Sequence, residues 1–349
     1  MKILINVPSL NLLGGVSNHY IGLRPFWKED VQYNVVGKRS KHAKMGAFWL
    51  PFDLVKFLFK LLFFHPDVVL LNPSLGKTAL IRDSFFLKLS VILKFKTAIM
   101  IHGFDWDYAY GADWLKLSRL FNKASLIFVL ASSFKKFMME NGVKTPIHLT
   151  TTKVDDRLLK DFDINKKGGV VRNLLFLARI EKTKGVYIAI DTYKILKEKY
   201  PKLSLSIVGD GSEIDNVRKY VLDENLKDVR ITGPLYGNDL IRELQNGDLA
   251  SSSSSYGEGM PTVVLEQMAF GMSIFTRNVG GLPDFFENGK MGYITDSLDP
   301  KDFAEAMIPY IENAELTKKV ARYNHEYAIE HFLASKVARS LETTLRELL

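Results

Sequence analysis

Short apolar runs alternate with amphipathic stretches along most of the chain. The runs are typical of strands buried on both faces, and the stretches between them have helical periodicity. This order is typical of βαβ units and predicts parallel sheets in an α/β protein. In the first half the expected strands are Lys2–Val7, Val31–Val36, Asp67–Leu71, Thr97–Ile101, Leu126–Val129 and Thr145–Leu149, and the expected helices include Pro51–Phe64, Lys77–Lys94 and Asp113–Asn122.

A polar segment from Thr150 to Gly169 separates this series from a second series of the same kind. We interpret it as the crossing between two domains, at 1–160 and 170–330. The tail from Asp299 is helical by period, with Pro309 as an expected break. The second series contains the expected strands Asn173–Leu177, Leu203–Val208, Val229–Thr232, Leu249–Ser252 and Ser273–Thr276, and the expected helices Gly185–Lys199, Glu213–Glu224, Asn238–Asn246 and Pro261–Phe270.

Length and composition fit this division. A chain of 349 residues is long enough for two domains of roughly 150 residues each, and 47% hydrophobic with 25% charged residues is typical of soluble globular proteins. The absence of cysteine excludes disulfides, cysteine nucleophiles and cysteine metal sites. The first apolar run is too short for a signal peptide and stops at Pro8, so we expect a cytoplasmic protein.

Charge is unevenly distributed. Residues 1–150 carry 20 Lys and Arg against 9 Asp and Glu, a net charge of +11, whereas residues 151–349 carry 27 against 30, a net charge of −3. This difference suggests that the two halves meet different partners. Because no nucleic-acid-binding motif accompanies the positive charge, we expect no nucleic acid partner.

The sharpest candidate for chemistry is the segment 256–269, which reads YGEGMPTVVLEQMA. Glycines lead into Pro261, which is favoured as a first helical residue. The amides of Thr262 and Val263 would then form an anion site suited to a diphosphate. Glu258 precedes the helix, and Glu266 lies more than one turn inside it, where it can reach a ribose diol. Alternatively, Glu258 only caps the helix and Glu266 is a surface carboxylate.

Within this segment, E-G-x-P-x-x-x-L-E-x-M-A-x-G resembles the retaining family 4 glycosyltransferases of GT-B fold. The resemblance continues through Gly271 into Gly280-Gly281-Leu282-Pro283-Asp284. It implies two facing Rossmann-like, doubly wound domains with the reaction in the cleft between them. It also implies that a C-terminal helix at about 330–349 packs back on the N-terminal acceptor domain, and that the second domain binds the nucleotide-sugar donor.

Phe176 to Gly185 resembles the family's strand, Arg, loop, Lys, Gly and helix element. A strand would deliver Arg179, and the loop would return Lys184 beside it at a helix start. Two cations there would neutralise the leaving nucleoside diphosphate, so no metal is expected. The resemblance also places Gly209 and Thr232 near the donor nucleotide, and Gly259, Met260 and Pro261 near the sugar.

In the first domain, Gly14-Gly15-Val16 follows a strand and opens a helix, and Gly15 is the position that the resemblance places near the donor phosphates and the acceptor. His102 follows another strand, where parallel sheets place ligands, and the family implies that it contacts the transferred sugar. Asp105 is a candidate acceptor contact. Asp105-Trp106-Asp107 also fits the Asp-x-Asp metal motif of the GT-A fold, which stays open as a less favoured alternative.

Two interpretations are open for Phe52–Phe64 and Lys77–Lys96. They are either ordinary crossover helices that pack on the sheet, or a basic surface for an anionic membrane. The interruption of the first segment by Lys56 and Lys60, together with its length, excludes a membrane span.

The sequence thus predicts a retaining glycosyltransferase that uses a UDP- or GDP-sugar without metal. The acceptor would be a glycan or a lipid-linked acceptor, in cell-surface polysaccharide synthesis at the inner face of the membrane. His102, Glu258, Arg179 and Lys184 are the candidate catalytic residues. The alternatives are a nucleotide-sugar epimerase, which should carry more cleft histidines and carboxylates, and a non-catalytic nucleotide-sugar-binding protein.

Overall fold

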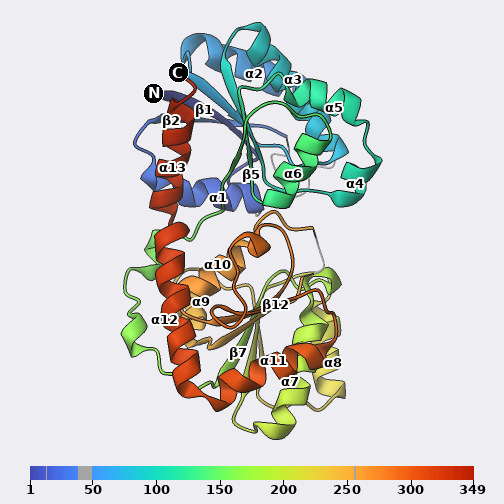
Figure 1. Cartoon of the computed structure of the whole chain (residues 1–349), viewed down its shortest axis with the longest axis vertical. Coiled ribbons are helices and arrows are strands. Elements are labelled where there is room, and N and C mark those ends of the chain that lie inside the picture. Colours follow the sequence, from blue (N-terminus) through green and yellow to red (C-terminus); the bar gives the residue numbers. More distant parts are fainter. Residues whose placement is uncertain (13, 38–48, 255–256) are drawn as a thin grey trace. The chain divides into compact units, whose positions relative to one another are not determined.

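The computed structural model describes residues 1–12, 14–37, 49–254 and 257–349. The chain forms two compact units, each built on its own six-stranded sheet (Figure 1). Unit 1 comprises Met1–Lys153, Gly257–Met260 and Ala334–Leu349, and unit 2 comprises Val154–Tyr256 and Pro261–Leu333. Unit 1 thus ends at Lys153 rather than at residue 160. Val154 already belongs to unit 2, where its amide donates to the Phe332 carbonyl at 2.7 Å.

The sheet of unit 1 is parallel, in the order β2-β1-β3-β4-β5-β6. Its central strands are apolar and buried because helices cover both faces of a parallel sheet. The strands are β1 Lys2–Val7, β2 Asp30–Val35, β3 Val68–Leu71, β4 Lys96–Ile101, β5 Leu126–Val129 and β6 Ile147–Leu149. The helices are α1 Gly15–Leu23, α2 Leu50–Phe63, α3 Lys77–Ile92, α4 Trp106–Gly111, α5 Trp114–Phe121, α6 Ser132–Glu140 and α13 Ala334–Arg346.

The sheet of unit 2 is also parallel, in the order β12-β11-β10-β7-β8-β9. Its strands are β7 Asn173–Leu177, β8 Ser204–Val208, β9 Val229–Gly233, β10 Leu249–Ser252, β11 Ser273–Arg277 and β12 Gly292–Thr295. Its helices are α7 Val186–Lys199, α8 Ile214–Asp223, α9 Gly237–Asn246, α10 Thr262–Ala269, α11 Pro300–Glu312 and α12 Ala314–His331. The expected doubly wound α/β class is confirmed.

Each sheet reverses its winding direction at one point. In unit 1 the reversal lies between β1 and β3, and in unit 2 between β7 and β10. Ligands of doubly wound sheets bind at the carboxyl ends of the strands that flank such a reversal. The topology therefore directs attention to the loops after β1 and β3 in unit 1, and after β7 and β10 in unit 2.

Two expectations about proline are wrong. Pro309 does not break the tail, because α11 continues through it to Glu312 and the break follows at Asn313, whose side chain caps α12. Pro309 lacks the N–H that would donate to the Glu305 carbonyl, so α11 continues with one intrahelical hydrogen bond fewer. Pro261 is the N-cap of α10 and not its first residue, since its backbone is extended with φ −72° and ψ 101°.

The C-terminal helix α13 belongs to unit 1, where it lies against α1 (Figure 1). Its apolar face buries Val337, Leu341 and Leu345. The Glu342 carboxylate accepts hydrogen bonds from the amides of Lys28 and Glu29 at 2.7 and 2.8 Å. Within the described ranges, every helix is either too short or too polar to cross a bilayer.

Candidate functional site

The loops at the carboxyl ends of β7, β8 and β9 in unit 2 are joined by backbone hydrogen bonds. The Ala178 amide donates to the Val208 carbonyl at 3.2 Å, and the Ile180 amide donates to the Asp210 carbonyl at 3.0 Å. The Gly209 amide in turn donates to the Gly233 carbonyl at 3.0 Å. The backbone of Arg179 is therefore held on both sides by the turn that follows β8.

Arg179 points out of this held backbone, with 63% of its side chain exposed. Its guanidinium donates to the Glu181 carboxylate at 2.8 Å. An exposed ion pair of this kind contributes little to stability, so breaking it in favour of another anion costs little free energy. Arg179 can thus turn from Glu181 to another anion at low cost.

Lys184 ends the short turn Lys182–Lys184 that leads into α7, and it is buried. Gly185 follows with φ +80°, and a Cβ there would lie 2.4 Å from the Ser253 hydroxyl. The hydroxyls of Ser253 and Ser254 donate to the carbonyls of Gly185 at 3.1 Å and Thr183 at 3.4 Å. The serine run after β10 therefore holds the Lys184 turn in place, at the reversal point of the sheet.

Helix α10 follows β10, whose succeeding serines hold the Lys184 turn. The first amide with a partner inside the helix is that of Val264, which donates to the Pro261 carbonyl at 3.0 Å. The amides of Thr262 and Val263 precede it, as the anion-site hypothesis requires. Glu266 lies one turn further on and is buried, which excludes the alternative of a surface carboxylate.

Gly209 has a structural role. It has φ +142°, and a Cβ there would lie 1.9 Å from the Ala178 carbonyl oxygen. The close approach of these two backbones explains this glycine without a ligand. The Thr232 hydroxyl donates to the Gly233 carbonyl at 2.8 Å at the end of β9.

In unit 1, His102 lies at the end of β4 and joins a buried polar cluster at the reversal point. Its Nε2 lies 3.0 Å from Oδ1 of Asn72, which follows β3. The Tyr20 hydroxyl donates to the same Oδ1 at 2.6 Å, and Asn72 Nδ2 donates to the Asn6 carbonyl at 2.8 Å. The Asn6 carbonyl fixes the orientation of the Asn72 amide.

This orientation also fixes the tautomer of His102. Because Asn72 Oδ1 can only accept, Nε2 of His102 carries the hydrogen and Nδ1 is left as an acceptor. Burial lowers the pKa of His102 to about 3, so the ring is neutral at physiological pH. His102 can therefore accept a hydrogen bond from a hydroxyl, but it is not a general acid near pH 7.

The loop Gly257–Met260 lies against the same residues of unit 1. A Cβ on Gly259 would come within 2.0 Å of the His102 carbonyl oxygen, so only glycine fits there. Met260 is buried and Glu258 is half-buried. The structure therefore brings the expected sugar-contacting loop to His102.

Gly15 differs from the other glycines. It is exposed as the first residue of α1, and a Cβ there would meet no atom within 4 Å. Packing among the described residues therefore does not demand glycine at this position. Asp105 instead caps α4, since its Oδ1 accepts from the Tyr108 amide at 3.0 Å. The described residues contain no group of three His, Asp or Glu placed to hold a metal ion.

Asn72, Tyr20 and His19 were not among the residues predicted from the sequence. His19 is buried in α1 with its ring 5.1 Å from that of His102, and neither of its nitrogens has a hydrogen-bond partner among the described residues. Burial, followed by His102 and Lys153, lowers the pKa of His19 well below its usual value. The available signal for His19 was its position one turn after Gly14-Gly15, on the helix that these glycines were expected to open.

Comparison with known proteins agrees with this architecture. The chain aligns with solved structures over nearly its whole length. The Anabaena Alr3699/HepE structure in complex with UDP and glucose has a TM-score of 0.73 at 19% identity and covers 99% of both chains. A glycosyltransferase from Rickettsia africae ESF-5 has a TM-score of 0.76 at 16% identity and covers 99% of this chain and 98% of that one. At this identity the likeness defines the fold, which is GT-B.

The family comparison concerns mainly unit 2. Residues 159–327 match the model of the family described as glycosyl transferases group 1. The Bacillus subtilis spore coat protein SA is 30% identical over 176 residues, 48% of this chain and 47% of that protein. A glycogen synthase of Mycobacterium tuberculosis is 31% identical over 153 residues, 43% of this chain and 36% of that enzyme. The match thus spans about half, or less, of these curated relatives.

The resemblance stated from the sequence is confirmed. The chain has the GT-B fold, and its residues 159–327 match the model of the group 1 glycosyltransferases.

Proposed function

We propose that this protein transfers a sugar from a nucleoside-diphosphate donor to a glycan or lipid-linked acceptor, with retention of the anomeric configuration. The observation that carries the proposal is the placement of Arg179, Lys184 and the first turn of α10 on loops that leave the two strands at the reversal point of the unit 2 sheet. The two cationic side chains and the N-terminus of α10 supply the positive charge that stabilises a departing diphosphate.

In this proposal Arg179 and Lys184 bind the diphosphate together with the amides of Thr262 and Val263. Glu266 accepts hydrogen bonds from the ribose diol, and Gly209 and Thr232 border the nucleotide. Glu258 and the backbone of Gly259, Met260 and Pro261 contact the sugar. Because two side-chain cations and a helix end serve the leaving group, no metal is required.

His102 and Gly15 are proposed to serve the transferred sugar and the acceptor. In this proposal Nδ1 of the neutral His102 accepts a hydrogen bond from a sugar hydroxyl, and a ligand approaches the backbone at Gly15, where a Cβ would meet no described atom within 4 Å. Catalysis then lies in positioning and in stabilisation of the leaving group. Asp105 remains the weakest candidate for an acceptor contact, because capping α4 already accounts for it.

The names of the relatives indicate where to begin. UDP and glucose occupy the Anabaena protein, and this favours UDP as the first nucleotide to test. A role in cell-surface polysaccharide synthesis is part of this proposal, and one relative is named as a spore coat protein. The proposal also has the enzyme act in the cytoplasm, at the inner face of the membrane.

The test is calorimetric melting with UDP or GDP, with and without EDTA. A ligand that binds only the folded state raises the melting temperature, by the equivalent of about 2.7 kcal/mol at a hundredfold excess over Kd. We expect one of the two nucleotides to stabilise the protein in EDTA, and Arg179→Ala or Lys184→Ala to remove most of the shift.

Arg218→Ala is the matched control, because Arg218 is an exposed arginine of unit 2 that pairs with Asp215 on α8. It should keep the full nucleotide shift. If neither nucleotide raises the melting temperature, or if the shift requires a divalent cation, the donor-site proposal is wrong. Transfer activity is tested separately, by detecting sugar transferred from the nucleotide donor to an acceptor.

A further inference from the structure

The outward side of α2 in unit 1 is apolar. Phe52, Val55, Phe59, Leu62 and Phe63 are all exposed, with Phe63 80% exposed. They recur at the spacing of one helical face, opposite the buried Phe57 and Leu61 that pack on the sheet. Exposure of five large apolar side chains on one short helix is unusual for a soluble surface.

The neighbouring helix α3 extends this surface. The two helices pack together through Phe57 and Phe86, whose rings lie 5.1 Å apart. On the outside of α3, Ile81, Phe85 and Ile92 are exposed, with Ile92 73% exposed. We call these eight exposed residues of α2 and α3 the α2–α3 face. Unit 2 exposes far fewer large apolar side chains among the described residues, and they are scattered.

The exposed charged side chains of α2 and α3 beside the α2–α3 face are positive. Lys56 and Lys60 lie on α2, and Lys77 and Lys88 lie on α3. The acidic residues of these two helices, Asp53 and Asp83, are buried. Lys56, Lys77 and Lys88 are exposed beside the α2–α3 face, Lys60 is half-buried, and neither helix exposes a carboxylate.

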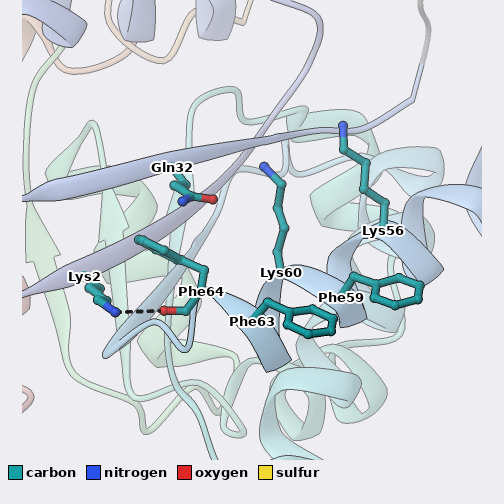
Figure 2. Close-up of a pocket in the computed structure, with 7 residues that line it drawn as sticks. All are labelled: Lys2, Gln32, Lys56, Phe59, Lys60, Phe63 and Phe64. Carbon is teal, nitrogen blue, oxygen red and sulfur yellow. Dashed lines mark hydrogen bonds between the residues drawn. The ribbon is translucent and has the colours of Figure 1, made fainter.

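Lysines also line a hollow beside this face. Between α2 and the first two strands lies a hollow of about 400 Å³, into which Lys2, Lys56 and Lys60 reach. Figure 2 shows the Lys56 and Lys60 side chains rising from α2 toward the strand that carries Gln32, with Phe59 and Phe63 side by side at the rim. The Lys60 ammonium donates to the Tyr33 carbonyl at 2.6 Å, which holds it in place.

We propose that the α2–α3 face docks on a membrane surface rich in anionic lipid, with the aromatic side chains in the interfacial region and lipid phosphates at the lysine hollow. Aromatic and aliphatic side chains that insert beside lysines are the combination by which interfacial helices bind such surfaces. A second copy of this chain is a poorer occupant, since it would bring the same lysines opposite one another.

The experiment is co-sedimentation of the full chain with vesicles of phosphatidylcholine alone, or with part of it replaced by phosphatidylglycerol. We expect the wild type to bind the anionic vesicles more than tenfold better than the neutral ones. The double variants Phe59→Ser/Phe63→Ser and Lys56→Gln/Lys60→Gln should each lose about tenfold in binding, and high salt should weaken the wild type.

The matched control is Leu222→Ser, which removes a 77% exposed apolar side chain of unit 2 on α8. It should leave vesicle binding unchanged. Equal binding to both vesicles, no binding, or unchanged binding by the phenylalanine variant would overturn the proposal. Self-association that only the phenylalanine variant abolishes would assign the face to a second copy instead.

The nucleotide-dependent melting shift separates this proposal from the donor-site proposal. The vesicle-binding variants should keep the same shift as the wild type, because their substitutions lie outside the proposed donor site. If neither the wild type nor any variant responds to nucleotide, the donor-site proposal is wrong, whereas the vesicle-binding result is unaffected.

Discussion

At the scale of single residues, the neutral tautomer of His102 gives the sharpest test. Asparagine can place an acceptor near the position of Nδ1, whereas glutamine can reach the position of Nε2. If Nδ1 contacts the sugar, His102→Asn should keep more activity than His102→Gln, with a difference of roughly tenfold in kcat/KM, the value of about one hydrogen bond. Steady-state transfer assays at one pH measure it.

Melting temperatures of both His102 variants provide the control, because either could disturb the Asn72 cluster. The reverse order, with glutamine the more active, would mean that Nε2 and its bond to Asn72 matter and that Nδ1 does not contact substrate. Equal activity of both variants and the wild type would remove His102 from the site.

The position of His102 was predictable because this residue directly follows an apolar strand. The tautomer of His102 was not predictable, because it depends on Asn72 and Tyr20 from other elements. The ion pair between Arg179 and Glu181 was equally invisible, because a loop sequence does not state which way its side chains turn. Chemistry at strand ends was predictable, but the hydrogen bonds that tune it were not.

At the scale of elements, the turn after β8 should tolerate no side chain at Gly209. Gly209→Ala would force a Cβ to within 1.9 Å of the Ala178 carbonyl, at φ +142°. We expect a loss of about 3 kcal/mol or more in the free energy of unfolding, and loss of the nucleotide shift, because the same turn holds Arg179. Urea unfolding measures the first effect.

Gly233→Ala is the matched control for backbone strain alone, since Gly233 has φ +76° but open space around a Cβ. It should cost only about 1 kcal/mol. If Gly209→Ala is as stable as Gly233→Ala, the loops after β7 and β8 can move apart to admit the Cβ. The backbone of Arg179 is then not held as described.

Apolar runs located most strands to within a residue or two, because a strand buried on both faces has few polar positions. The bounds of helix α6 were not predicted, since it follows β5 almost directly and its N-cap, Ala131, gives no capping signal. Strand β12 was missed because Gly292–Thr295 is short and only partly apolar. The break assigned to Pro309 fell at Asn313 instead.

At the scale of the molecule, unit 1 depends on α13 from the far end of the sequence. Leu341 is buried in its interface, so Leu341→Ala should lower the free energy of unfolding of unit 1 by about 2–5 kcal/mol. All four tryptophans, Trp27, Trp49, Trp106 and Trp114, lie in unit 1, so tryptophan fluorescence follows this unit selectively.

Leu349→Ala, at an exposed leucine in the same segment, should change stability by less than about 0.5 kcal/mol. If Leu341→Ala leaves the fluorescence transition in place, α13 is not required by unit 1. The resemblance predicted the return of this helix, but the residues that hold it, such as Glu342 with its two backbone donors, emerged only from the structure.

Unit 1 is assembled from segments that lie far apart in the sequence, and this has a consequence for folding during protein synthesis. A ribosome releases residues 154–333 before it releases α13, so the whole of unit 2 is available to fold while unit 1 still lacks a helix that covers its α1 side. We infer that nascent chains carry an unfinished first unit for the time needed to make the second. During that interval the apolar side chains that α13 later covers are open to chaperones.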